Sequence, residues 1–278
     1  MNLLHCQILH PKYIEEHRSL QLFFDHGKAN EMGSEQLHAW EHVCEILETG
    51  AIRSLVTTSQ RKSKSGKSIF ISGANVTERI GWSNEQVKEH VRWQRSVLQR
   101  LRNVPCFHIC LVDGIALGWG TEFLLTADYR ITTSDSTFGL PETSLGILPG
   151  AGGTSELWME IGIAHAMRLG MTGEKIDGAE ATRIGLTQEI TENWEQGMQR
   201  VKTLSQLVST RSPTAVAAFK NALLLSKGRN TEMRTNLESN AYEHCVNTGE
   251  AQVGRENFKK ILSGEAIQWG AFQQLQNS

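Results

Sequence analysis

The stretch DGIALGWGTEF (Asp113–Phe123) decides the predicted fold of this 278-residue chain. It follows a β-like run, Phe107–Val112, and its glycines are typical of a turn from a strand into a helix. Such a turn gathers free N–H groups and the positive end of a helix dipole at one place, which suits an anion or an oxyanion. We expect the helix to run to about Ala127, with Glu122 in its first turn.

Two further glycine-rich stretches have the same character. ISGANV (Ile71–Val76) follows a predicted strand, and its small residues allow backbone N–H groups to approach a ligand closely. FGLPETSLGILPGAGGT (Phe138–Thr154) carries Glu142 and leads into another predicted helix. Each glutamate also has a plain alternative, because Glu122 could complement the helix dipole and Glu142 could be a solvent-facing loop acid.

Short β-like runs alternate with helical patterns over the first two thirds of the chain, which predicts an α/β fold with crossover connections. The predicted strands are 19–24, 52–58, 68–72, 107–112 and 129–134, and the predicted helices are 34–47 and 84–102. Beyond about residue 191 the β-like runs end, and helices are predicted at 194–208, 213–225, 231–246 and 251–262. We therefore expect an α/β core over 1–194 and a helical region over 195–278 that packs on the core or on a neighbouring subunit.

Composition argues against several classes of protein. With 28 Lys+Arg against 30 Asp+Glu, the formal charge of −2 disfavours a nucleic-acid binder held by its overall field. No apolar run approaches the roughly 18–20 residues of a membrane span, so no membrane association is expected. The first residues are a poor match to a secretory signal or a transit peptide. Five scattered cysteines favour reduced thiols in a cytoplasmic protein over a disulfide framework or a zinc ribbon.

Three short motifs resemble known sites without meeting their requirements. HAWEH (His38–His42) matches a zinc pattern, but no third ligand is evident, so no metal is expected. Gly66–Ser68 resembles the end of a phosphate loop but leads into a strand, and its basic neighbours are interpreted as a solvated hairpin tip. Gly118–Gly120 lacks the third glycine of a dinucleotide-binding turn.

Taken together, the glycine-rich stretches resemble the crotonase family, which contains the enoyl-CoA hydratases and isomerases. FISGANV (70–76) resembles the family segment F-x-A-G-A-D-L, and DGIALGWGTEFLLTADYRI (113–131) resembles the signature N-G-x-A-x-G-G-G-x-E-L…x-D-x-R-I. FGLPETSLGILPGAGGT (138–154) is similar to F-x-x-P-E-x-x-L-G-x-x-P-G-x-G-G-T. Shorter matches at KANEM (28–32), SPTAVAAFKNAL (212–223) and GRENFKK (254–260) extend the resemblance over about residues 18–262.

The resemblance implies a core of β-β-α turns wound into a superhelix. It also implies a helical C-terminal region that builds homotrimers, often paired as hexamers. The implied ligand is an acyl-CoA thioester of the kind met in fatty acid metabolism. Coenzyme A would enter as part of the substrate, with no separate cofactor.

The resemblance also implies roles for individual residues. The backbone N–H groups of Ala74 and Trp119 match the pair that holds the thioester carbonyl in an oxyanion hole. Glu122 and Glu142 match the two hydratase glutamates, as base toward water and as acid toward the α carbon. The presence of both favours enoyl-CoA hydration, or the reverse dehydration. The other matched substrate- or CoA-binding positions are Lys28, Ala29, Ser72, Gly73, Gly118, Gly150 and Lys259.

One residue departs from the family pattern, because Trp119 stands in the middle of what is usually Gly-Gly-Gly. Its φ must therefore lie below zero, and its indole either packs beneath the helix or lines the acyl pocket. Two alternatives to a hydratase stay open. One is another crotonase-fold acyl-CoA enzyme, such as an isomerase, a hydrolase or a polyketide-pathway dehydratase, and the other is a non-catalytic assembly partner.

Overall fold

Two β-sheets form the core of the protein, whose computed structural model describes residues 4–275. The first sheet has the strand order β1-β2-β3-β5-β7-β10, and the second has the order β4-β6-β8-β9. Neighbouring strands are parallel except in the antiparallel pairs β1–β2 and β8–β9. The strands are β1 (Pro11–Ile14), β2 (Ser19–Phe24), β3 (Ser54–Ser59), β4 (Ile69–Ile71), β5 (Phe107–Val112), β6 (Ile115–Leu117), β7 (Tyr129–Thr133), β8 (Thr137–Gly139), β9 (Ile176–Asp177) and β10 (Glu189–Thr191).

The chain alternates between the two sheets as it proceeds. The strands β3 and β4 are followed by α2 (Asn84–Arg102), and β5 and β6 by α3 (Trp119–Leu124). The strands β7 and β8 are followed by the 3-10 helix η4 (Pro141–Leu145) and by α4 (Leu157–Ile161). This repeated strand-strand-helix winding confirms the predicted α/β fold class and the crotonase-type superhelix. The remaining helices are η1 (Leu4–Leu9), η2 (Glu15–His17), α1 (Ser34–Glu48), η3 (Val76–Arg79), α5 (Ile163–Thr172), α6 (Gly178–Arg183), α7 (Trp194–Ser209), α8 (Pro213–Ser226), α9 (Thr231–Asn247), α10 (Glu250–Glu256) and α11 (Phe258–Leu262).

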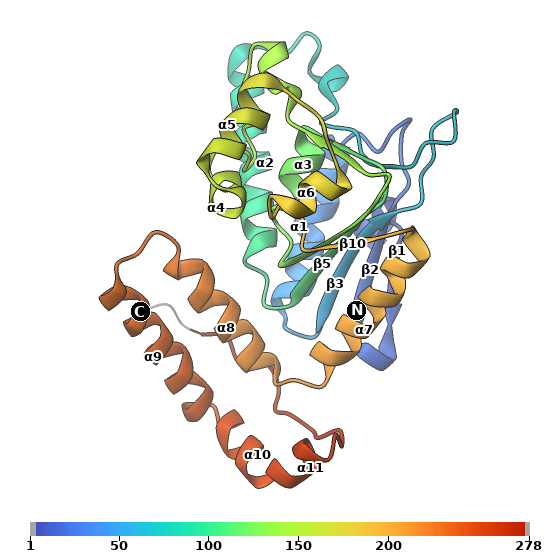
Figure 1. Cartoon of the computed structure of the whole chain (residues 1–278). Helices are drawn as coiled ribbons and strands as arrows, with labels where there is room; N and C mark the ends of the chain where they lie inside the picture. The colour runs from blue at the N-terminus through green and yellow to red at the C-terminus, as the bar shows by residue number, and fades with distance from the viewer. Residues whose placement is uncertain (1–3, 276–278) are drawn as a thin grey trace.

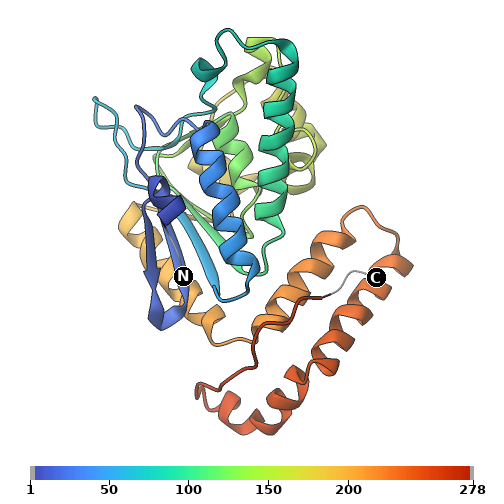
Figure 2. The same ribbon diagram turned by 180° about the vertical axis from the view of Figure 1, so that it is seen from behind.

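Helices cover both faces of the first sheet. Figure 2 shows α1 and α2 over one face, and Figure 1 shows α7 against the other. On the α7 side, a small core contains Val56, Ile109, Leu111 and Val201. On the opposite side the core is larger and includes aromatic rings, of which Phe24 and Phe70 meet edge to face at 5.3 Å between centroids. The α7 helix thus packs on the sheet, while the expected division of the chain at 194/195 stays a prediction.

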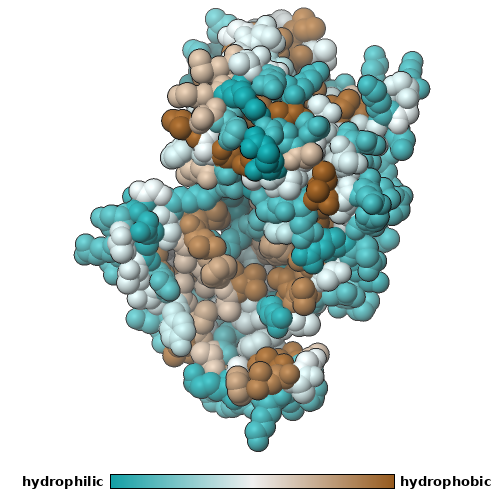
Figure 3. All heavy atoms as spheres, in the orientation of Figure 1, coloured by the Kyte–Doolittle hydropathy of each residue, from teal (hydrophilic) through white to brown (hydrophobic). Residues whose placement is uncertain are grey.

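The helices α8 to α11 extend from the core as an arm (Figures 1 and 2). The arm is attached by Lys220 of α8, whose Nζ donates to Asp128 at 2.8 Å and to the carbonyl of Cys106 at 3.1 Å. Apolar side chains gather in the hollow between arm and core (Figure 3), and Phe219 and Leu223 of α8 are exposed. None of the helices in residues 4–275 combines the length and apolar character that a membrane crossing requires.

Where the sequence signals are strong, the observed ends of strands and helices agree closely with the predicted ones. The strands at 19–24 and 107–112 and the helix at 84–102 have the expected ends, and Ser83 caps that helix by accepting from the Gln86 N–H. The segment 251–262, expected as one helix, is divided into α10 and α11 at Asn257, which has φ −103° and ψ 14°. The helix of the glycine-rich turn ends at Leu124, three residues earlier than expected. The short strands β1, β6, β8, β9 and β10 were not predicted.

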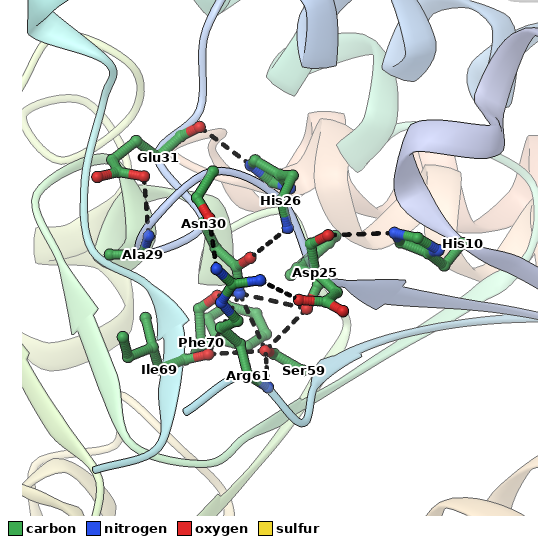
Figure 4. Close-up of polar contacts among 12 residues, drawn as sticks. His10, Asp25, His26, Ala29, Asn30, Glu31, Ser59, Arg61, Ile69 and Phe70 are labelled. Carbon is green, nitrogen blue, oxygen red and sulfur yellow. Dashed lines mark hydrogen bonds and ion pairs between the residues drawn. The ribbon is translucent and has the colours of Figure 1, made fainter. Parts of the chain in front are cut away.

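Asn30 connects the strand ends that lead to the candidate site (Figure 4). It is fully buried, and its Nδ2 lies within hydrogen-bonding distance of Ser59 Oγ and of the carbonyls of Phe24, Ile69 and Phe70, at 2.9–3.3 Å. It adopts φ +55°, and its Oδ1 accepts from the backbone of His26 at 2.9 Å. One amide thus joins the ends of β2 and β3 to β4, the strand before Ile71–Val76.

Replacing Asn30 by alanine is expected to destabilise the protein by about 3 kcal/mol, because several buried partners lose their donor and a Cβ-bearing residue stays at positive φ. Urea unfolding would measure the loss. The matched control is Asn103→Ala, since the exposed Asn103 side chain donates only to the carbonyl of Gln99 in its own helix. Equal stabilities of the two variants would contradict the assignment of Asn30 as a connecting residue.

Candidate active site

A cavity of about 200 Å³ lies between α2, α3, η4 and the loop that follows β4. Most of the site residues expected from the sequence line this one cavity. Those residues are Ser72, Gly73, Ala74, Gly118, Trp119, Glu122, Glu142 and Gly150. Segments more than 70 residues apart in the sequence therefore contribute to a single site.

The three remaining expected residues lie outside the cavity. The carbonyl of Ala29 accepts from the Ser72 N–H at 3.2 Å, so Lys28 and Ala29 run beside the cavity wall. The side chain of Lys28 is exposed. Lys259 is exposed on α11, at the far end of the arm, and this chain does not bring it to its own cavity.

Two backbone N–H groups without an acceptor border the cavity. Ala74 forms an isolated parallel bridge in which Met32 donates to the carbonyl of Gly73 and Asn75 donates to the carbonyl of Met32. That pattern leaves the N–H of Ala74 without a partner among residues 4–275. Trp119 is the first residue of α3, so its N–H has no acceptor within the helix.

Close backbone contacts hold these two segments together. A Cβ on Gly120 would lie 2.3 Å from the carbonyl oxygen of Ile71, so only glycine allows α3 to approach β4 this closely. Gly118, which precedes the helix, has φ +54° and ψ −120°, and a Cβ there would lie 2.8 Å from Oε1 of Glu142. The hydroxyl of Thr121 secures the turn by donating to the carbonyl of Ala116 at 2.7 Å.

Trp119 has the negative φ that the sequence analysis required, since the positive-φ residues other than glycine in the described chain are His10, Arg18 and Asn30. Its side chain is 2% exposed and packs on Phe123, with 5.7 Å between ring centroids. The indole therefore packs in the core under the helix, and the residue also contributes to the cavity wall. Its Nε1 is buried without a hydrogen-bond partner in the described residues.

Glu122 is held by the glycine-rich loop after η4. Its side chain is 3% exposed, and Oε1 accepts from the backbone N–H groups of Ala151 at 2.7 Å and Gly153 at 2.9 Å. The sequence analysis pointed to Gly150 in this loop. That residue lines the cavity, and its carbonyl accepts from Nε of Arg95 at 3.0 Å.

Burial governs the protonation of both glutamates. The pKa of Glu122 is raised to about 7, mainly by desolvation. The amides of Gly153 and Ala151 lower this pKa, and the negative charge of Glu142 contributes to the rise. Burial also raises the pKa of Glu142, whose Oε2 is buried and has no partner within residues 4–275. Near neutral pH the pair therefore tends to retain a proton, and its two ionisations are coupled.

Other candidate sites in the chain are less suited to chemistry. A cavity of about 320 Å³ lies between α8 and the core, but its acids are paired, Asp128 with Lys220 and Glu160 with Arg130 and Lys227. The described part of the chain contains no group of three metal-ligating side chains.

The motifs set aside in the sequence have structural explanations. His38 and His42 contact Glu41 and Glu45 on their own helix. The basic loop forms the expected hairpin, closed by backbone bonds from Ser63 to Lys67 and from Ile69 to Arg61. No disulfide joins the cysteines of the described chain.

Several cavity residues were not predicted from the sequence. Arg79 of η3 and Gln94 of α2 contribute polar groups, and Leu145, Ile147 and Leu148 contribute apolar surface. The apolar run at 145–148 was a visible signal, since it interrupts a glycine-rich loop. Arg79 and Gln94 gave no local signal, because only the packing of η3 and α2 brings them to the cavity.

Comparison with known proteins identifies the family of the chain. A family model described as enoyl-CoA hydratase/isomerase matches residues 29–264. The chain is 33% identical over 248 residues to YngF of Bacillus subtilis, whose name places it among the enoyl-CoA hydratases/isomerases, covering 88% of this chain and 92% of that one. It is 31% identical over 222 residues to a short-chain-enoyl-CoA hydratase of Clostridium acetobutylicum, covering 79% and 82%. The crystal structure of an enoyl-CoA hydratase from Bacillus anthracis superposes with a TM-score of 0.84 at 28% identity, covering 93% and 97%. The chain therefore belongs to the enoyl-CoA hydratase/isomerase family.

Proposed function

We propose that this protein adds water across the 2,3-double bond of an acyl-CoA thioester, or catalyses the reverse dehydration. One observation carries the proposal: two backbone N–H groups without acceptors, from Ala74 and Trp119, and two buried glutamates, Glu122 and Glu142, border the same cavity. A thioester carbonyl accepted by the two amides would be polarised, which makes its β carbon electrophilic. Donors of this kind stabilise the enolate oxygen, and the loss of one typically costs about 3–4 kcal/mol of barrier.

The two glutamates then divide the proton transfers. Glu122, fixed through Oε1 by two amides, would take a proton from water as the water oxygen bonds to the β carbon. Glu142 would give its proton to the α carbon as the enolate collapses, and the product would be a 3-hydroxyacyl-CoA. Because the two buried acids favour one shared proton, one base and one acid are present together near neutral pH.

The alternative functions require only some of the groups at this cavity. An isomerase or a thioester hydrolase needs the amides but does not require two acids beside the α and β carbons. A non-catalytic assembly partner would have no use for two acids whose burial is costly. A family relationship at 28–33% identity is compatible with each of these activities, so an assay must separate them.

The remaining features of the proposal concern the coenzyme and the assembly. Lys28 and Ala29 lie beside the Ser72 end of the cavity, where we expect the nucleotide part of coenzyme A. Lys259 lies on the arm, where it could reach the coenzyme of a neighbouring subunit in a homotrimer or hexamer. We further expect a cytoplasmic enzyme of fatty acid metabolism that needs no cofactor besides the coenzyme A of its substrate.

Glu122→Gln and Glu142→Gln are each expected to lower kcat on crotonyl-CoA by about 100-fold or more, because each removes one general acid or base. The loss of the enoyl absorbance would measure hydration. Glu85→Gln is the matched control, since Glu85 is an exposed acid on α2 that pairs with Lys88 and Arg92. If the wild type binds CoA but leaves several enoyl-CoAs unchanged, the hydratase proposal fails.

The activity and stability of the protein should depend on pH in opposite directions. Because Glu122 acts as a base, kcat/KM is expected to rise as the pH increases through about 7. The pKa of Glu122 is raised from an unfolded value near 4.5, so the folded state binds more protons between pH 4.5 and 7. The free energy of unfolding should therefore fall across that window, by as much as about 3 kcal/mol.

Thermal unfolding of Glu122→Gln at pH 5 and pH 8 would test the stability effect. The variant lacks the buried charge, so it is expected to gain stability relative to the wild type at pH 8 and to lose most of that advantage at pH 5. A variant that is less stable than the wild type at pH 8 by as much as at pH 5 would contradict the raised pKa.

A further inference from the structure

An arginine that forms no ion pair within the described residues borders the candidate active site. Arg79 is the last residue of η3, five residues after Ala74, and it lines the cavity. Its Nε and Nη2 are buried, and no described residue accepts a hydrogen bond from them. No carboxylate of the described chain forms an ion pair with it, although sixteen ion pairs occur elsewhere.

The charge of Glu78 raises the pKa of Arg79 against the larger, lowering effect of burial, but Glu78 forms no hydrogen bond or ion pair with the guanidinium. Glu78 accepts from the Ser34 N–H at 3.0 Å, and its other oxygen lies 3.4 Å from Nε2 of His90. Burial, and secondarily the charge of Arg79, lower the pKa of His90, which favours a neutral imidazole there. The cation that acts on Glu122 is Arg95, not Arg79. The guanidinium is therefore not neutralised by either catalytic candidate.

A second unpaired donor lies on the same cavity. Gln94 of α2 is 3% exposed and lines the cavity, and its Nε2 is buried without an acceptor in residues 4–275. Buried polar groups are nearly always hydrogen-bonded in folded proteins, and an unpaired buried donor is unfavourable, more so when it is charged. Both residues line the same cavity, which makes a bound ligand the candidate source of the missing acceptors.

We infer that the acyl chain of the substrate carries a carboxylate at its far end, which Arg79 and Gln94 bind. The inference rests on the proposed function, because it names the substrate class of the same site. A carboxylate is planar and anionic, and it can accept two parallel N–H bonds from a guanidinium. It also brings a carboxylate to within hydrogen-bonding distance of the guanidinium, which no acid of residues 4–275 does. The preferred substrates are then enoyl-CoAs derived from dicarboxylic acids.

Binding of two saturated acyl-CoAs of equal shape would test this inference without the reaction. Glutaryl-CoA ends in a carboxylate, and 5-methylhexanoyl-CoA replaces the two carboxylate oxygens by methyl groups. The wild-type protein, in its native assembly, is expected to bind glutaryl-CoA about 10- to 100-fold more tightly by calorimetry, as one charged hydrogen-bonded contact typically provides. Arg79→Met should reduce that ratio to about one, and Arg79→Lys should restore part of it.

The control is Arg92→Met, which removes an exposed arginine from α2 that pairs with Glu85. It is expected to keep the wild-type binding ratio. Circular dichroism and thermal unfolding would show that each variant is folded. If Arg79→Met weakens both acyl-CoAs equally, the arginine contacts the coenzyme and not the acyl chain, and the inference is overturned.

Kinetics with the corresponding enoyl-CoAs separates this inference from the proposed function. Hydration of both 5-methyl-2-hexenoyl-CoA and glutaconyl-CoA without preference would overturn the carboxylate site and leave the hydratase proposal intact. A binding preference for glutaryl-CoA that disappears in Arg79→Met, with no hydration of either enoyl-CoA, would support the carboxylate site and reject the hydratase proposal. A higher kcat/KM for glutaconyl-CoA in the wild type, reduced by at least tenfold relative to the branched analogue in Arg79→Met, would support both.

Discussion

The site depends on one backbone contact, the approach of α3 to the strand β4. Gly120 lies so close to the carbonyl of Ile71 that any Cβ would lie 2.3 Å from it. This contact holds α3 against β4 at the point where Ala74 follows the strand and Trp119 opens the helix, and it brings their unpaired N–H groups to one cavity. The fold therefore creates a pair of backbone donors from two turns that have no sequence proximity. A side chain could rotate away from such a position, whereas backbone amides held by packed elements cannot, and preorganisation of this kind is what makes donors effective toward a developing oxyanion.

The same closely packed elements hold the acids of the site in place. Glu122 is buried, and the loop at Ala151 and Gly153 offers it two amides, which stabilise its anionic form. Desolvation outweighs those amides and raises the pKa, and the neighbouring charge of Glu142 acts in the same direction. The result is a carboxyl group whose pKa lies close to neutral pH. The free energy of unfolding therefore falls as that proton dissociates. Function and stability are commonly opposed in this way at buried ionisable groups.

The sequence predicted those parts of the structure whose causes are local. The alternation of β-like runs and helical patterns was enough for the class of fold, and the strand at 107–112 and the helix at 84–102 follow from apolar patterning. The cap at Ser83 is an addition from the structure. The eight residues that meet at the cavity lie in long glycine-rich stretches, where the resemblance to a family identified them. Short strands such as β6 and β8 escaped prediction because two or three residues carry too little pattern. Arg79 and Gln94 escaped it because nothing in the local sequence distinguishes them from solvated residues on a helix.

Unsatisfied polar atoms occur in several parts of the described chain, and five of them belong to residues beside the cavity. Across residues 4–275 most buried polar side chains have partners, as the network around Asn30 illustrates. Beside the cavity, in contrast, Trp119 Nε1, Glu142 Oε2, Gln94 Nε2 and two nitrogens of Arg79 all lack them. These atoms include a hydrogen-bond acceptor, on the acid, and hydrogen-bond donors, on the indole, the amide and the guanidinium. Each of these costs could be removed by an apolar substitution, so the polar groups beside the cavity are retained at the expense of stability. A ligand with a carbonyl, a reactive double bond and an anionic end would supply partners for the acid, the amide and the guanidinium, whereas the indole of Trp119 packs in the core.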